Sequence, residues 1–236
     1  MQTKSVPVIK VEGVHKKLGK QQILKDINLQ IAKGEIFGLL GPNGAGKSTL
    51  LSIITNILKP DKGTIFINNK KQSEFKNYKM IGYVPQEIAL YPSLSAYDNL
   101  IFWANMYNLK NKKKLAYEIL EFLSLTDVAK KPVFNFSSGM KRRLNIGISL
   151  IHSPDIIILD EPTVGIDLAS KTIILKKILE LKKQGKTFIF TTHNPDEPYK
   201  ICDKIGVLKE QRIQHVGRLE NVLAFYNKKS IEDLMT

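Results

Sequence analysis

The chain has 236 residues and a net charge of +14, from 36 Lys and Arg against 22 Asp and Glu. Its length allows a sizeable hydrophobic core, its single cysteine, Cys202, excludes an internal disulfide, and no apolar run approaches the roughly 20 residues that cross a bilayer. The first residues contain no signal-peptide core, so we expect an intracellular chain whose basic surface is either solvated or faces anionic groups.

The first part of the chain is predicted to be β-structure. Residues 7–12 and 23–31 alternate between apolar and polar side chains, which predicts two strands of an antiparallel layer. Residues 35–40 are largely apolar and predict a short buried strand. This strand leads directly into a glycine-rich segment.

That segment fits a phosphate-binding loop, which is a Gly, four residues and then Gly-Lys-Ser. Its residues are Gly41, Pro42, Asn43, Gly44, Ala45, Gly46, Lys47, Ser48 and Thr49. The glycines let successive backbone N–H groups surround phosphate oxygens, Lys47 brings a mobile positive charge, and the Ser48 hydroxyl can ligate Mg²⁺. A helix predicted over residues 49–58, opening near Lys47, points its positive end at the same anion. The order strand, loop, helix predicts a nucleoside triphosphate site.

Further strands and a helical segment follow. Residues 63–69 predict a strand and turn, and residues 81–86 predict a strand that leaves Gln86 at its carboxyl end, where open α/β sheets bind ligands. From about residue 95 to about residue 153 the apolar spacing is helical throughout, which predicts an inserted helical subdomain. Within it, Trp103 and Tyr107 mark either a partner-binding face or, more commonly for such pairs, ordinary packing.

Two carboxylates end the next apolar run, over residues 155–161, which is typical of a central parallel strand. Successive strand residues point in opposite directions, so Asp160 and Glu161 should have different roles. We expect Asp160 to hold Mg²⁺ through its water shell and Glu161 to polarise an attacking water. The alternative is that the two acids only cap a helix.

The remainder predicts a helix over residues 168–184 and a strand over residues 187–192, with His193 at the strand's tip. His193 is then the third polar group at a carboxyl end, which favours a site over a structural histidine. A hairpin over residues 205–208 and 212–216, followed by a short mixed helix, completes the chain.

Taken in order, these segments resemble the nucleotide-binding domain of the ATP-binding cassette (ABC) family, and the resemblance covers nearly the whole chain. The matching pieces are the phosphate loop, Gln86, the signature-like run Ser137 to Arg143, the strand Ile156 to Glu161, the loop Gly165 to Asp167, and His193. The resemblance implies an α/β fold: a P-loop NTPase core with a mostly parallel sheet, an antiparallel β subdomain and the inserted α-helical subdomain. It also implies that residues 1–236 form a single ABC ATPase domain.

The resemblance further implies a head-to-tail dimer, either a homodimer or a heterodimer, with two ATP molecules and Mg²⁺ in its interface. The signature residues that would contact the partner's ATP in trans are Ser137, Ser138, Gly139 and Met140. Asp167 would be the dimer contact. Lys47, Glu161 and His193 would be catalytic, and the metal would be held by Ser48, by Gln86 and, through water, by Asp160.

Three positions depart from the family pattern. Leu18 stands where the family usually places an aromatic residue against adenine, so we expect it to contact the base without stacking on it. Ser138 replaces the first signature glycine, and Met140 stands where glutamine is commonest. Ser138 adds bulk near a phosphate but keeps hydrogen-bond donors, which predicts reduced turnover rather than none. Leu168 stands where a proline often follows the dimer-contact aspartate.

The implied function is that of an ATPase subunit that powers a membrane transporter through ATP-driven dimer closure. The ending Met-Lys-Arg-Arg resembles exporter-type branches that handle drugs, lipids, peptides or ions. The expected partner is a membrane-spanning permease, which would hold the chain at the cytoplasmic face of the membrane. It would dock between the helical insertion and the loop after Gln86. The apolar cluster of Ile88, Leu90 and Tyr91 in that loop either packs under the insertion or stays open for a partner helix, and we favour the second.

Two alternatives belong to other classes. One is a soluble cassette ATPase that acts on nucleic acid or ribosomes, but such relatives usually carry a long coiled-coil insertion or tandem cassettes. The chain has neither, so no nucleic-acid partner is expected. The other is a regulatory protein that binds nucleotide without hydrolysing it, and the presence of Lys47, Asp160 and Glu161 argues against this.

Overall fold

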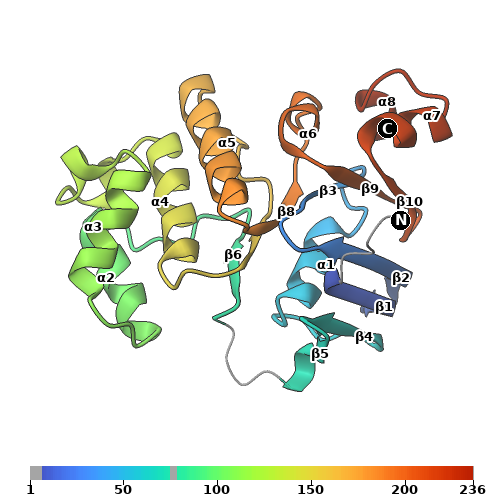
Figure 1. The fold of residues 1–236 in the computed structure, drawn as a ribbon, viewed down its shortest axis with the longest axis horizontal. Coiled ribbons are helices and arrows are strands. Elements are labelled where there is room, and N and C mark those ends of the chain that lie inside the picture. The colour runs from blue at the N-terminus through green and yellow to red at the C-terminus, as the bar shows by residue number, and fades with distance from the viewer. Residues whose placement is uncertain (1–6, 75–78, 236) are drawn as a thin grey trace.

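A six-stranded sheet runs through the middle of the computed structural model, which describes residues 7–74 and 79–235 (Figure 1). Its order is β10-β9-β3-β8-β7-β6, and all neighbours are parallel except β10 and β9, which form the predicted hairpin. The strands are β3 (Ile36–Leu40), β6 (Ile81–Val84), β7 (Ile156–Leu159), β8 (Thr187–Thr191), β9 (Lys204–Lys209) and β10 (Arg212–Gly217). Every residue of β3, β7 and β8 is buried, because helices or strands cover both faces.

A second, four-stranded sheet lies beside it and is antiparallel, with the order β2-β1-β4-β5. Its strands are β1 (Pro7–Leu18), β2 (Gln21–Ala32), β4 (Lys62–Ile67) and β5 (Lys70–Lys71). Apolar residues of both sheets pack around helix α1 (Lys47–Ile54) in one core. The predicted antiparallel layer is confirmed. The pairing of β1 with β2 extends to Leu18 opposite Gln21, and Leu18 lines the same pocket as residues of the phosphate loop.

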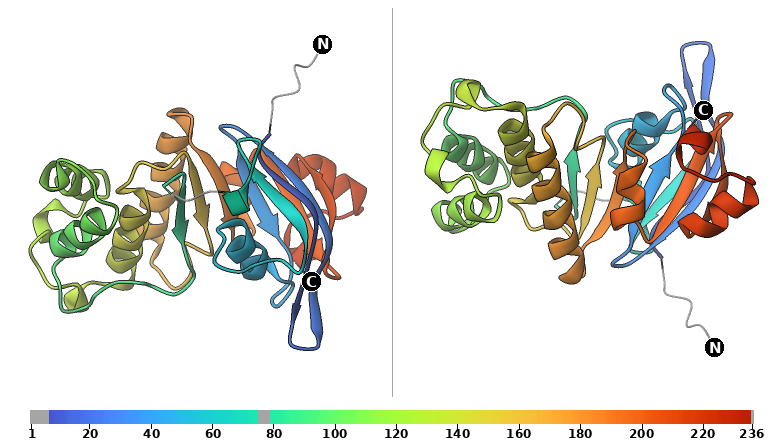
Figure 2. Two further views of the ribbon diagram at one scale, coloured as in Figure 1. Left: turned by 90° about the horizontal axis from the view of Figure 1, so that it is seen from below. Right: turned by 90° about the horizontal axis from the view of Figure 1, so that it is seen from above.

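The helical segment extends from one end of the molecule, away from the antiparallel sheet (Figure 2). It contains α2 (Ala96–Met106), α3 (Lys112–Phe122) and α4 (Ser138–Leu150), with short 3₁₀ turns at Thr126–Val128 and Val133–Asn135. Within the described residues no strand lies between β6 and β7, as predicted. These helices enclose an apolar core of their own, separate from the core around α1.

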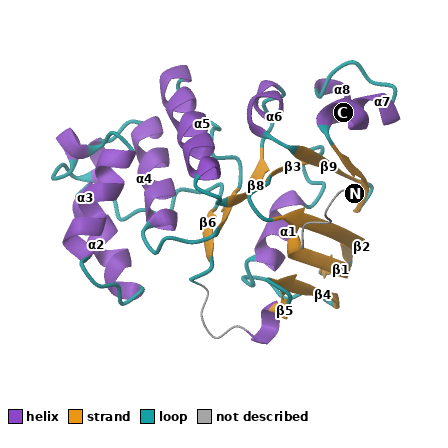
Figure 3. Ribbon diagram, viewed as in Figure 1, coloured by secondary structure: helices purple, strands orange, loops and turns teal. Residues whose placement is uncertain are grey.

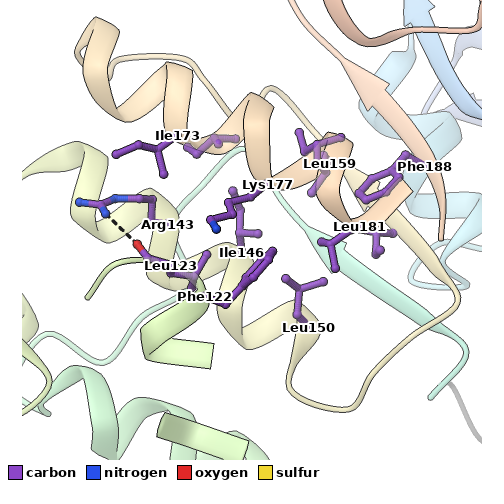
Figure 4. Close-up of a pocket in the computed structure, with 13 residues that line it drawn as sticks. Phe122, Leu123, Arg143, Ile146, Leu150, Leu159, Ile173, Lys177, Leu181 and Phe188 are labelled. Atoms are coloured by element: carbon purple, nitrogen blue, oxygen red, sulfur yellow. Dashed lines mark hydrogen bonds between the residues drawn. The ribbon is translucent and has the colours of Figure 1, made fainter. Parts of the chain in front are cut away.

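Helices α4 and α5 (Leu168–Lys183) join the helical segment to the sheet (Figure 4). Apolar side chains from both helices and from β7 and β8 surround a cavity of only about 10 Å³. Such a volume holds about one water molecule, and the apolar walls offer water no hydrogen-bond partners. The two helices and the sheet are therefore closely packed here. At its rim the Lys177 ammonium lies 4.6 Å from the Phe122 ring centroid, and Arg143 Nη1 donates to the Leu123 carbonyl at 2.7 Å.

Several boundaries differ from the predictions (Figure 3). The first helix ends at Ile54, not at residue 58, because Asn56 takes a left-handed φ of 59° and ends the helical hydrogen bonding. Helix α6 (Asp196–Ile201) was not predicted. Its two prolines, Pro195 at the N-cap and Pro198 in the first turn, lie where a missing N–H breaks no helical hydrogen bond. The tail forms two helices, α7 (Leu219–Phe225) and α8 (Glu232–Met235), in place of one.

The expectation for the loop after Gln86 is wrong for Leu90. Leu90 packs against the core of the helical segment, whereas Ile88 and Tyr91 are exposed. The buried side chain of Asn99 explains this placement, because its Oδ1 accepts from Tyr91 N at 2.9 Å and its Nδ2 donates to Tyr91 O at 3.1 Å. These hydrogen bonds hold the loop against α2.

Within residues 7–74 and 79–235, no helix combines the length and the hydropathy that a membrane span requires.

Candidate nucleotide-binding and catalytic site

A pocket of about 540 Å³ lies where the phosphate loop meets the ends of β6, β7 and β8. It is lined by Leu18, Ile23, Asn43, Gly44, Gly46, Lys47, Ser48, Thr49, Gln86, Glu161 and His193. Most of the predicted nucleotide and catalytic residues are thus brought together from distant parts of the sequence. Gly41, Pro42 and Ala45 belong to the same loop but do not line the pocket, and neither does Asp160, which has only 2% of its surface exposed.

The phosphate loop takes its shape from both its glycines and its lysine. Gly41 has a φ of 147°, and a Cβ there would lie 2.1 Å from the Leu208 carbonyl oxygen on β9, so only glycine fits. The buried Lys47 Nζ donates to the carbonyls of Gly41 at 2.8 Å and Pro42 at 3.0 Å. Burial lowers the pKa of Lys47, and the nearby Glu161 and Asp160 oppose that shift by favouring the ammonium.

The end of β7 is held by Thr191 of β8. Thr191 Oγ1 donates to Asp160 Oδ1 at 2.7 Å and accepts from the backbone N–H of Glu161 at 2.9 Å. Glu161 has a left-handed φ of 50°, an uncommon conformation for a residue with a side chain, and one that costs about 1–3 kcal/mol. One hydroxyl therefore fixes both the Asp160 carboxyl and the turn that directs Glu161 into the pocket.

The Glu161 carboxylate contacts the two other predicted polar residues. Gln86 Nε2 donates to Glu161 Oε2 at 3.1 Å, and His193 Nε2 contacts Glu161 Oε1. Gln86 follows β6, Glu161 follows β7 and His193 follows β8, and these are neighbouring parallel strands. The carboxyl ends of such strands meet at one edge of the sheet, which is why three residues far apart in sequence converge.

The signature residues lie elsewhere, at the start of α4. Ser137 caps that helix, its Oγ accepting from Met140 N at 3.2 Å, and Ser138 is exposed. Asp167 caps α5, its Oδ1 accepting from Ser170 N at 2.8 Å, and these contacts lower the pKa of Asp167. A Cβ on Gly139 would lie 2.5 Å from Ser170 Cβ, so glycine is required for α4 to approach α5. The signature and dimer-contact segments thus adjoin each other within one chain but do not line its own pocket.

A family model described as ABC transporter matches residues 24–164, more than half of the chain. The chain belongs to the ABC transporter family. It is 45% identical to the linearmycin resistance ATP-binding protein LnrL of Bacillus subtilis strain 168, over 89% of this chain and 69% of that protein. It is 37% identical to the lantibiotic transport ATP-binding protein SrtF of Streptococcus pyogenes, over 87% and 89%.

The fold matches solved ABC cassettes as well. A dimeric cassette in a post-hydrolysis state, bound to ADP and inorganic phosphate, superposes with a TM-score of 0.81 at 29% identity, over 89% of this chain and 98% of that one. The predicted resemblance and the predicted fold class are confirmed. The chain is an ATP-binding and ATP-hydrolysing subunit of a transporter, and its relatives favour this over an ATPase that acts on nucleic acid or ribosomes.

The polar groups of this ABC site suit Mg²⁺. Ser48, Gln86 and Asp160 present hydroxyl, amide and carboxylate oxygens, which are hard donors of the kind that magnesium prefers. Because Gln86 Nε2 faces Glu161, its amide oxygen is the end that can face a cation. The described residues contain no cluster of three or more acidic, His or Cys ligands. A site with few protein ligands, completed by phosphate and water, is the usual way in which proteins hold Mg²⁺.

Two buried residues near the ABC site were missed from the sequence. Arg142 of α4 is 4% exposed and donates from Nη1 to the Pro85 carbonyl at 3.1 Å and from Nη2 to the Gln86 carbonyl at 2.8 Å. Glu197 of α6 is fully buried. In the sequence, Arg142 belongs to the signature-like run and Glu197 is one of two acids before a proline, but nothing indicated that either is buried or which groups it contacts.

Proposed function

We propose that this chain is one ATPase domain of an exporter-type ABC transporter, in which Glu161 activates the water that cleaves ATP. The observation that carries the proposal is the position of the Glu161 carboxylate, held between Gln86 and His193 in the pocket that Lys47 also lines. The test is to purify the chain with its bound partners from detergent-solubilised membranes and to measure ATP-dependent transport. An ATPase that co-purified with nucleic acid and no membrane protein would contradict it.

Different residues of the pocket act on different groups during ATP hydrolysis. Glu161 accepts a proton from water as the water oxygen bonds to the γ-phosphorus, and ADP departs with the bridging oxygen and its electron pair. Lys47 and the N–H groups of the phosphate loop offset the charge on the phosphates, and His193 orients Glu161. Ser48, Gln86 and Asp160 would hold Mg²⁺, whose charge would neutralise oxygens of the β- and γ-phosphates.

The second half of the ATP site comes from a partner subunit. Ser137 and Ser138 are exposed at the start of a 13-residue helix, so their hydroxyls and the helix N-terminus are accessible to an anion outside this chain. Asp167 and Leu168 are also exposed beside them, with Leu168 at 77%. In a head-to-tail dimer this face would lie over the partner's phosphate loop. ATP bound between the two would then contact both subunits and stabilise the closed dimer.

The permease is proposed to dock in a groove of about 500 Å³ between the helical segment and the core. It is lined by Thr55, Asn56, Ile57, Ile81, Tyr83, Pro85, Ala89, Trp103, Tyr107, Asn145, Ile148 and Ser149. Trp103 and Tyr107 pack partly against the helical core but also face this groove. The lining is mostly apolar and aromatic, which suits an occupant that presents an apolar surface.

The rim residue Ile57 provides a direct test of docking. It is 67% exposed, so Ile57→Asp should leave the fold intact while placing a charge where a permease segment would bury an apolar side chain. Burying an Ile is worth about 1.5–3 kcal/mol, so permease recovery with the chain should fall on the order of tenfold or more. Phe225→Asp is the matched control, because Phe225 is 62% exposed and lies on α7, outside the groove. Equal recovery of the two variants would contradict docking at this groove.

Base recognition can be tested at Leu18, which is 48% exposed and lines the pocket beside Ile23. Leu18→Tyr adds a ring face, and base–aromatic stacking is worth about 1–3 kcal/mol, so ATP should bind ~5- to 150-fold more tightly. GTP should gain similarly, since every base has a π-face. Leu18→Met, apolar but without a ring, is the control. A tyrosine variant that bound no more tightly than the methionine variant would show that the base lies elsewhere.

The cargo is proposed to be a drug, lipid, peptide or ion that leaves the cell. Support comes from the similarity to one protein named for linearmycin resistance and to another named for lantibiotic transport. The chain would then work at the cytoplasmic face of the membrane, held there by its permease. Its excess of basic residues suits an anionic membrane surface, at about 1 kcal/mol for each well-placed Lys or Arg.

A further inference from the structure

We propose that Glu197 is a positioning residue, which holds the Glu161 and His193 segments to each other and to the start of α5. The inference rests on the catalytic roles proposed above for Glu161 and His193. Glu197 lies on α6, is completely buried, and has polar contacts with three separate segments of the chain.

Each contact joins a different part of the site. Thr163, two residues after Glu161, donates from Oγ1 to Glu197 Oε2 at 3.0 Å. Thr192, the residue before His193, donates from Oγ1 to the same oxygen. Lys171 Nζ lies 2.9 Å from Glu197 Oε1, and its side chain is only 15% exposed. One carboxyl group therefore connects the chain after β7, the chain after β8 and the first turn of α5.

The chemistry of a carboxylate explains why this residue type stands here. An ionised carboxylate only accepts hydrogen bonds, so one oxygen of Glu197 can accept from both hydroxyl donors while the other forms an ion pair with the Lys171 ammonium. Thr192 Oγ1 also accepts from Asn194 N at 3.0 Å, so the same hydroxyl connects the backbone directly after His193 to Glu197. Leaving any of these buried groups unpaired is costly, so the three segments are held in one arrangement.

The same network reaches the dimer-contact segment. Lys171 follows Ser170, which bonds to the Asp167 cap and packs against Gly139 of the signature run. Glu197 thus lies between the proposed catalytic pair on one side and the proposed dimer face on the other. This position distinguishes it from a buried acid that serves only the packing of α6.

The test removes single hydroxyl groups without changing side-chain shape. Thr163→Val and Thr192→Val each take one donor away from Glu197, and Thr163→Ser and Thr192→Ser keep the donor. Misplacement of a catalytic group by about 1 Å can cost on the order of 100-fold. We expect kcat to fall ~10- to 100-fold in the valine variants, the KM for ATP to change less than about threefold, and serine to restore most of kcat. Thr172→Val is the matched control, because Thr172 of α5 is exposed, donates from Oγ1 to the Leu168 carbonyl at 2.9 Å and does not contact Glu197.

Glu197→Gln offers a second route if a valine variant does not fold, since it keeps the side-chain volume and one acceptor oxygen. It should lower kcat at least ~10-fold with ATP affinity unchanged. The proposal would be overturned by valine variants with wild-type kcat, by serine variants as impaired as valine, or by a loss of ATP affinity in Glu197→Gln as large as its loss of kcat.

Glu161→Gln and His193→Ala are measured in parallel, so that failure of this inference can be told from failure of the proposed function. If these two variants kept wild-type turnover, the proposed catalytic roles would be wrong and this inference with them. If they lost turnover while the valine variants did not, only this inference would be wrong.

Discussion

Replacing Glu161 with Gln is expected to slow ATP hydrolysis by ~10²- to 10⁴-fold while ATP still binds, since a positioned general base contributes about that much. The amide keeps the size of the side chain and its contacts with Gln86 and His193 remain possible, but it cannot take the proton of the attacking water. The measurement is steady-state phosphate release at saturating Mg-ATP, together with ATP affinity from the fluorescence of a labelled nucleotide.

The matched control for this experiment is Glu118→Gln. Glu118 lies on α3, is 53% exposed in its side chain and forms a surface ion pair with Lys114, so removal of its charge should leave turnover within about twofold. Near wild-type turnover in Glu161→Gln would show that another group activates the water. Loss of binding together with hydrolysis would show instead that Glu161 acts mainly on the shape of the pocket.

Replacing Lys47 with Ala should weaken binding of ATP by ~10- to 150-fold. Hydrogen bonds to charged groups are worth about 1.5–3 kcal/mol, and the buried ammonium is the one Lys or Arg cation among the residues that line the pocket in the described chain. Its loss also frees the carbonyls of Gly41 and Pro42, which it now contacts. Equilibrium binding of Mg-ATP by titration calorimetry measures the effect, and ADP should lose less than ATP because the γ-phosphate is absent.

Lys33→Ala serves as the control, because Lys33 is exposed in the turn before β3 and does not line the pocket. If Lys47→Ala bound ATP as tightly as Lys33→Ala, the backbone N–H groups of the loop would carry the phosphate binding alone. A lowered thermal unfolding midpoint in Lys47→Ala without any loss of ATP affinity would assign the residue to loop stability.

The order of local elements could be predicted from the sequence because their signals are local. The continuous apolar run before Gly41 and the β-branched run before Asp160 each form strands of the buried sheet, as their composition indicates. The convergence of Gln86, Glu161 and His193 followed from one rule, that parallel strands end at the same edge. Helix ends could not be predicted in the same way. Helix α1 ends before the predicted residue because Asn56 takes a left-handed conformation, and the periodicity of apolar residues does not reveal that conformation.

Contacts between segments that are distant in sequence were decided only by the tertiary structure. The requirement for glycine at position 139 comes from Ser170, on another helix, and the requirement at position 41 comes from Leu208, on another strand. Leu90 turned inward because Asn99 binds the backbone of its neighbour Tyr91. Arg142 and Glu197 acquire their partners only when α4 and α6 dock on the sheet. A buried charge is stable only with partners, and which partners it meets depends on packing that no local pattern encodes.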